Sequence, residues 1–107
     1  MSLETKLKAA LATLEDYKAQ QISVIPLAGK ATFADYMIVV SGTSTTHTRS
    51  IAQGLEKHLK SEVFSIEGQQ ESSWICVDLS QIIVHIFLPE KRALYNLEKL
   101  WSHTFIL

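Results

Sequence analysis

The feature that most constrains the fold is an uninterrupted apolar run at residues 36–40, which reads Tyr-Met-Ile-Val-Val. Such a run is typical of a strand that is buried on both faces of a sheet, because neither of its faces carries the polar side chains that water would favour. The run ends at Ser41-Gly42-Thr43-Ser44, where serine and threonine favour the start of a helix. The residues that follow place apolar side chains on one helical stripe, at Ile51, Ala52, Leu55 and Leu59. The sequence therefore predicts a buried strand that leads into an amphipathic helix.

Two further helices and four further strands are predicted around this unit. Apolar residues at helical spacing predict a helix at residues 3–17. Pro89, a residue favoured at the first position of a helix, begins another, whose apolar stripe is Leu94, Leu97 and Trp101. Strands are predicted at residues 22–27, 63–66, 74–77 and 82–87. The first of these contains Pro26, which places it at an edge of the sheet or ends it there.

The predicted order of elements is α-β-β-α-β-β-β-α. A helix between the strand at residues 36–40 and the strand at residues 63–66 predicts a crossover connection, and therefore partly parallel pairing. The chain has 107 residues, the size of one ordinary domain. We therefore predict an α/β fold, with an α+β-like mixed sheet of five strands and flanking helices, in a single domain that covers residues 1–107.

The composition excludes several classes of protein. Hydrophobic residues make up 47% of the chain, enough for one core, and the formal net charge of −1 implies no basic surface for phosphates. We therefore expect little or no direct binding to nucleic acid. One cysteine, Cys76, rules out an internal disulfide and fits a reducing compartment. No apolar run approaches the ~20 residues of a membrane-spanning helix, and charged residues among the first leucines argue against a signal peptide. These observations predict a cytoplasmic protein that does not bind membranes.

The last two strands are separated by a short connection, and strand side chains alternate between two faces. If Leu79 and Ser80 form the loop, Trp74 pairs with His85, Cys76 with Ile83, and Asp78 with Gln81. These six residues and Phe87 then share one side of the sheet, which we call the mixed face. The opposite side is purely aliphatic and is the predicted core: Ile75, Val77, Ile82, Val84 and Ile86.

Aromatic side chains among polar groups are typical of protein interfaces, where a few Trp, Tyr or Arg anchors carry most of the binding energy. The mixed face is therefore a candidate docking surface. The alternative is that a helix covers this face as well and that Trp74 simply packs beneath it. The pattern alone leaves both interpretations open.

The chain offers few candidates for catalytic chemistry. Gly42-Thr43-Ser44, at a strand-to-helix junction, could hold a phosphate, but it lacks the glycine spacing of known phosphate loops, and a helix cap is the favoured interpretation. Nucleotidyl transfer would need paired carboxylates, and Asp78 has no acidic neighbour at strand spacing. His47 and His58 are too far apart along one helix to share a metal ion. Cys76 and His85 make an incomplete zinc site, and Cys76 is better explained as a small apolar residue than as a nucleophile. We therefore expect no enzymatic activity, no catalytic residues, no cofactor and no metal.

Several strings, taken in order, match one known family: Phe33-Ala34-Asp35-Tyr36, Gly42-Thr43-Ser44, Glu67-Gly68, Trp74, Asp78 and Val84-His85. The stretch at residues 89–101 fits the pattern P-E-x-R-x-x-Y-x-L-E-x-L-W. From about residue 22 to residue 101 the chain resembles the ribosomal silencing factor (Iojap) family. One departure is that this chain has Leu79-Ser80-Gln81 where the family usually has Leu or Tyr, then Gly and Asp. A glycine that would ease the turn and one acidic group are therefore missing.

The resemblance implies a fold related in shape to nucleotidyltransferases but without their catalysis. It also implies a partner, the large ribosomal subunit through its fourteenth protein, and a role, which is to block joining of the two subunits and so repress translation. A role in assembly of the large subunit fits the same surface, and a nucleotide-binding enzyme is the third alternative. The aromatic face also suits a homodimer. The expected partner-binding residues are Trp74, Asp78, His85, Phe87, Pro89, Arg92 and Tyr95.

Overall fold

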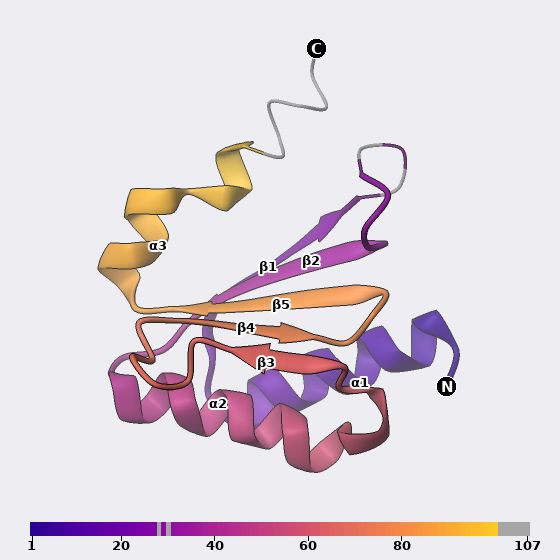
Figure 1. Cartoon of the computed structure of the whole chain (residues 1–107), viewed down its shortest axis with the longest axis horizontal. Coiled ribbons are helices and arrows are strands. Elements are labelled where there is room, and N and C mark those ends of the chain that lie inside the picture. Colours follow the sequence, from indigo (N-terminus) through magenta and orange to yellow (C-terminus); the bar gives the residue numbers. More distant parts are fainter. Residues whose placement is uncertain (28, 30, 101–107) are drawn as a thin grey trace.

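The computed structural model describes residues 1–27, 29 and 31–100. Its elements follow the predicted order, with one short 3-10 helix in addition. They are α1 (Leu3–Asp16), β1 (Gln20–Pro26), β2 (Tyr36–Ser41), α2 (Thr45–His58), η1 (Lys60–Glu62), β3 (Ser65–Glu67), β4 (Trp74–Asp78), β5 (Ile82–Phe87) and α3 (Pro89–Tyr95). The strands form one five-stranded sheet in the order β1-β2-β5-β4-β3. The predicted mixed α/β fold with flanking helices is therefore confirmed (Figure 1).

The predicted partly parallel pairing is confirmed, but the parallel pair is β2 with β5 rather than the two strands that α2 connects. β3, which follows α2, pairs with β4 at the far edge, and the other neighbouring strands are antiparallel. β2 therefore lies inside the sheet, and all its residues after Tyr36 are buried. β1 is an edge strand whose last residue is Pro26, as predicted. A proline at that position removes no hydrogen bond from the middle of the sheet.

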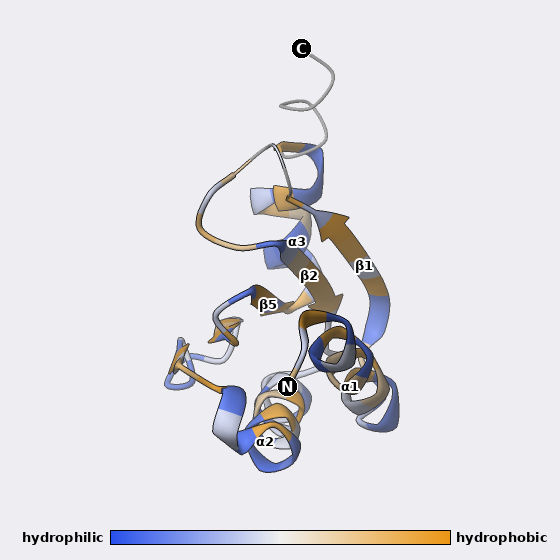
Figure 2. Cartoon of the chain, turned by 90° about the vertical axis from the view of Figure 1, so that its right-hand side faces the viewer, coloured by the Kyte–Doolittle hydropathy of each residue, from blue (hydrophilic) through white to orange (hydrophobic). Residues whose placement is uncertain are grey.

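The helices lie on both sides of the sheet. α1 and α2 cover one side and α3 lies over the other, as both orientations show (Figures 1 and 2). The side beneath α1 and α2 holds the main core, which includes every residue of the predicted aliphatic side of the hairpin. A smaller core on the other side comprises Leu27, Met37, Val39 and Phe87, with Trp74 and Leu97 partly buried against it. The two cores explain why β2 is apolar on both faces.

The predicted pairing of β4 with β5 is wrong by two residues. Trp74 lies opposite Phe87, Cys76 opposite His85, and Asp78 opposite Ile83. The turn lies one residue later than predicted, at Ser80 and Gln81, because Leu79 continues β4: its side chain is fully buried in the main core, and its amide donates to the carbonyl of Ile82. Because side chains alternate with a period of two, a shift of two residues leaves every side chain on its predicted face.

Most element boundaries differ from the prediction by one or two residues, and two of the differences have a visible cause. The strand predicted at residues 63–66 is observed at Ser65–Glu67, because Val63 ends the 3-10 helix η1 and packs against the main core. The last helix stops at Asn96, whose φ of 48° is left-handed, and helical backbone resumes at residues 97–100. The predicted stripe is broken there, since Leu94 is 71% exposed while Leu97 packs on the smaller core. Trp101, its third member, lies outside the described residues.

Candidate protein-docking face

The side chain of Trp74 lies at the centre of an aromatic cluster on the mixed face. Its ring stacks on Phe87 at 5.0 Å between centroids and meets Tyr95 of α3 at 4.7 Å. Its indole Nε1 donates a hydrogen bond of 3.0 Å to Nδ1 of His85. The indole is only partly buried, and 47% of Tyr95 is exposed. A helix therefore covers this face in part, as the alternative interpretation predicted, because α3 packs against Trp74. Part of Trp74 stays accessible, and its use in docking stays a prediction.

The imidazole of His85 is held neutral in this cluster. The indole N–H can only donate, so Nδ1 of His85 must accept, and the ring proton of the neutral imidazole is on Nε2. Burial lowers the pKa of His85 from its ordinary 6.5 to about 4, because the charged form loses its hydration. His85 is therefore a hydrogen-bond acceptor at neutral pH and carries no charge.

Cys76 lies beside His85 on the same face and is a weak nucleophile. Burial, and then the charges of Asp78 and Glu67, raise the pKa of its thiol from 9.0 to about 11. The thiolate needed for nucleophilic chemistry is therefore scarce at neutral pH. Asp78 has a structural role as well, because its Oδ1 accepts a hydrogen bond of 2.7 Å from the amide of Ser80 in the hairpin loop.

Two of the expected docking residues point inward. The side chain of Phe87 is 1% exposed and belongs to the smaller core. The side chain of Arg92 is 10% exposed and contacts Ser23 of β1, Ser41 of β2 and Glu98. Arg92 is thus directed toward β1 and β2, where each of its three nitrogen atoms donates one hydrogen bond, to these two hydroxyls and one carboxylate. The guanidinium is therefore engaged within the protein, and a contact between Arg92 and a partner stays a prediction.

The structure brings four of the seven expected residues into one cluster: Trp74, His85, Phe87 and Tyr95. Pro89 is exposed at the start of α3. Asp78 lies at the opposite end of β4 from Trp74.

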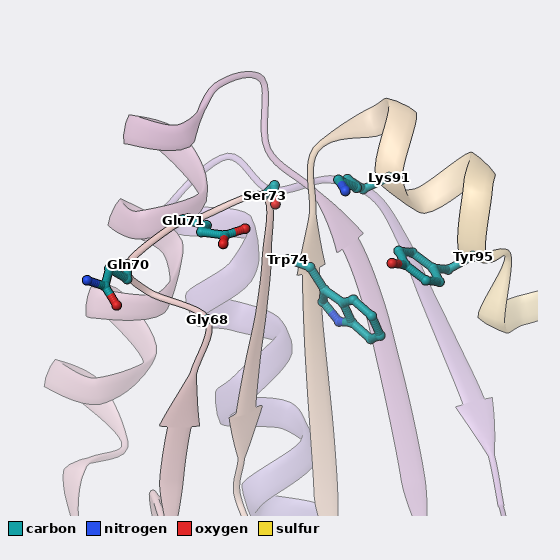
Figure 3. Close-up of a pocket in the computed structure, with 7 residues that line it drawn as sticks. All are labelled: Gly68, Gln70, Glu71, Ser73, Trp74, Lys91 and Tyr95. Atoms are coloured by element: carbon teal, nitrogen blue, oxygen red, sulfur yellow. The ribbon is translucent and has the colours of Figure 1, made fainter.

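A pocket of about 350 Å³ opens next to the aromatic cluster, between α3 and the loop that joins β3 to β4. Its lining residues are Gly68, Gln70, Glu71, Ser73, Trp74, Lys91 and Tyr95 (Figure 3). Sequence reasoning found Trp74 and Tyr95 but missed the loop. The available signal was Gly68, which has a φ of 91° and is so close to the carbonyl oxygen of Trp74 that any Cβ would collide with it. A glycine required at that point indicates that the loop folds back onto the start of β4.

The Gly42-Thr43-Ser44 segment caps α2, as the favoured interpretation predicted. The Ser44 hydroxyl accepts from the amide of His47, and the Thr43 amide donates to Nδ1 of the same histidine at 2.9 Å. A Cβ on Gly42 would lie 2.7 Å from the Thr48 side chain, so this glycine allows close packing of the loop on the helix. Two amides that a phosphate would use at this helix end are thus already engaged. Among the described residues, no three His, Cys, Asp or Glu side chains are grouped so that they could hold a metal ion.

The family described as "Ribosomal silencing factor during starvation" matches residues 1–105 of this chain. The chain belongs to the ribosomal silencing factor family. The ribosomal silencing factor RsfS of Zymomonas mobilis is 42% identical over 102 residues, which span 92% of this chain and 77% of that protein. A mouse relative named mitochondrial assembly of ribosomal large subunit protein 1 is 38% identical over 95 residues, 83% of this chain and 42% of the mouse protein.

A crystal structure of a protein from Chromobacterium violaceum superposes with a TM-score of 0.91, at 28% identity, over 95% of this chain and 88% of that chain. The family resemblance seen in the sequence is therefore confirmed, and so is the fold of the silencing factor. None of the helices within the described residues has the length and apolar character needed to span a bilayer.

Proposed function

We propose that this protein docks onto the large ribosomal subunit through its fourteenth protein and blocks joining of the small subunit, which represses translation. Membership of the ribosomal silencing factor family supports the ribosomal target. The main support for the location of the docking site is the Trp74 cluster, where a partly buried indole and an exposed Tyr95 border a pocket (Figure 3). Trp and Tyr beside a pocket are typical anchors, because they bury a large area at low entropic cost.

Exposure divides the expected docking residues other than His85 into two groups. Trp74, Tyr95, Pro89 and Asp78 are exposed or partly exposed and can touch a partner directly. Phe87 supports the Trp74 ring from beneath, at 5.0 Å. Arg92 holds α3 against the sheet, and so places Tyr95.

Sedimentation with purified subunits tests the proposal. We expect the protein to co-sediment with free large subunits and to be depleted from joined ribosomes. Addition before the small subunit should reduce joining, and addition afterwards should reduce it much less. Equal binding to joined ribosomes would contradict the steric mechanism.

A substitution tests the location of the docking site. Trp74→Ala should weaken binding to large subunits about thirtyfold, since an anchor is worth roughly 2 kcal/mol or more. Phe64→Ala is the matched control, because Phe64 is also an exposed aromatic residue, at 78%, but precedes β3 and lies outside the mixed face. Binding must be compared on folded protein, so each variant is also melted in urea. If both variants bind like the wild type, the docking site lies elsewhere.

A role in assembly of the large subunit is the second candidate, and the name of the mouse relative favours it. The two roles differ in cells without the protein. Loss of an assembly factor should cause precursors of the large subunit to accumulate during growth. Loss of a joining inhibitor should leave large subunits complete and increase joined ribosomes when translation is normally repressed.

The proposal includes no enzymatic activity, and the capping role of Gly42-Thr43-Ser44 supports this. A thermal shift with ATP or GTP that disappears in Ser44→Ala would instead support the nucleotide-binding alternative. We also propose that the protein acts in the cytoplasm with little direct contact to nucleic acid, in keeping with its net charge of −1. The predicted homodimer is tested by light scattering of the purified protein.

A further inference from the structure

His85 occupies a central position in the aromatic cluster around Trp74. It belongs to β5, the strand between β2 and β4. It lies opposite Val39 of β2 and opposite Cys76 of β4. Its ring is partly buried and contacts the rings of Trp74 and Phe87, with centroids 5.9 and 6.1 Å away. The neighbours on both sides and the aromatic rings above leave His85 little freedom to move.

The indole of Trp74 has a single polar atom, and His85 uses it. Tryptophan carries one donor and no acceptor, and Nε1 donates to Nδ1 of His85 at 3.0 Å. The ring is held at three points: this hydrogen bond, the stacked Phe87 and the ring of Tyr95. Only the hydrogen bond is directional enough to decide which way the indole plane is turned, since stacking tolerates rotation of one ring over another.

We propose that His85 is a positioning residue for docking, which acts by fixing the orientation of Trp74. This inference rests on the proposed docking function and adds how the anchor is prepared. Because the indole N–H is already engaged inside the protein, the partner meets the surface of the ring rather than a hydrogen-bond donor. The partner group that enters the pocket therefore packs against the indole surface by apolar or cation–π contact. Fixing the ring before docking also lowers the entropy lost on binding.

Two substitutions separate positioning from simple space filling. His85→Asn places an amide oxygen close to the site of Nδ1 and keeps an acceptor for the indole. His85→Leu keeps a side chain of similar bulk and removes the acceptor. Both are made with Trp101→Phe, which leaves Trp74 as the only indole of a chain that has two tryptophans. Urea melting confirms that each variant is folded.

The first readout is the NMR signal of the Trp74 indole N–H. We expect His85→Leu to shift this signal and to speed the exchange of the indole proton with water about fivefold or more. The free energy of one lost hydrogen bond corresponds to about a fivefold change in an equilibrium constant. His85→Asn should keep the signal protected. An unchanged indole signal in His85→Leu would overturn the positioning role, whether or not the protein docks on ribosomes.

The second readout is binding to purified large subunits. We expect His85→Leu to weaken binding about fivefold and His85→Asn to restore it to within about twofold of the wild type. In a Trp74→Ala background, His85→Leu should have no further effect, because its action passes through the indole. An equal loss in both backgrounds would show that His85 touches the partner itself and would overturn the inference. If Trp74→Ala itself binds normally, the proposed docking site fails, and the indole signal still reports on positioning.

Discussion

Replacement of Arg92 by alanine should destabilise the protein through loss of a buried network. The guanidinium, 10% exposed, donates from Nε to Glu98 at 2.9 Å, from Nη1 to Ser41 at 2.9 Å and from Nη2 to Ser23 at 3.2 Å. A hydrogen bond to a charged group contributes about 1.5–3 kcal/mol. Glu98 is 34% exposed, so water can partly replace its lost partner. We therefore expect Arg92→Ala to lower the free energy of unfolding by about 3 kcal/mol. This is the lower end of the loss that follows when one partner of a buried ion pair is removed, which is about 3–5 kcal/mol.

Urea unfolding followed by circular dichroism measures this loss. With a slope of roughly 1–3 kcal/mol per molar urea for a small protein, the midpoint should fall by more than about 1 M. Lys99→Ala is the matched control, since Lys99 is an exposed cation in the helical segment beyond Asn96. Arg92→Lys should recover little, because one ammonium cannot reproduce the planar fork of donors. If Arg92→Ala and Lys99→Ala unfold at the same urea concentration, the network contributes nothing and the reasoning is wrong.

The same network predicts a pH dependence. The hydrogen bond from Arg92, then that from Ser23, hold the pKa of Glu98 below its ordinary 4.5, although burial acts in the opposite direction. A carboxyl with a lowered pKa stabilises the fold above its unfolded pKa, and that contribution is lost as the pH falls through the folded value. The difference between wild type and Arg92→Ala should therefore shrink in acid below about pH 4.5.

Three further predictions concern the hairpin, the cluster and the loop. Ser80 has a φ of 71°, a left-handed conformation that glycine adopts more readily than serine. Ser80→Gly should therefore stabilise the protein by about 1 kcal/mol. A lower thermal midpoint for this variant would show that the backbone of Ser80 is not strained. The pKa of the partly buried His85 is lowered to about 4, so the unfolded chain takes up a proton at a higher pH than the folded protein does. The free energy of unfolding should therefore fall by about 2 kcal/mol from about pH 7.5 to about pH 5. In urea melts, His85→Asn should reduce the dependence of the free energy of unfolding on pH. If that dependence is unchanged, other titrating groups cause it. Gly68→Ala should cost more than about 2 kcal/mol because of its collision with Trp74, whereas Gly29→Ala, with a φ of 80° in open space, should cost only about 1 kcal/mol. Equal costs in thermal melts would rule out the collision.

The arrangement of faces in the hairpin could be predicted from the sequence, and its register could not. Alternation places Trp74 and His85 on one side and the aliphatic residues on the other, and a shift of two residues preserves this assignment. The register itself depended on Leu79, whose burial in the main core moves the turn from Leu79 and Ser80 to Ser80 and Gln81. A side chain in a short connection gives no local sign of whether the core has space for it.

Local pattern also predicted only some of the residues of the candidate site. Trp74 was recognised because aromatic side chains among polar groups are typical of protein interfaces, and Tyr95 because the family pattern includes it. The pocket loop from Gly68 to Ser73 was missed, since a polar loop has no periodicity that reveals what it packs against.

Local pattern thus determined the elements, the strand that is buried on both faces and the side of the sheet on which each hairpin residue lies, because the periods of strands and helices are properties of the chain itself. The direction of Arg92 was decided only by the tertiary structure. Its partners Ser41 and Ser23 are 51 and 69 residues away in sequence, and they become available only when β1 and β2 lie beneath α3. A long cationic side chain can reach solvent or turn inward from the same backbone position, and the choice depends on which polar groups the packed sheet leaves without partners.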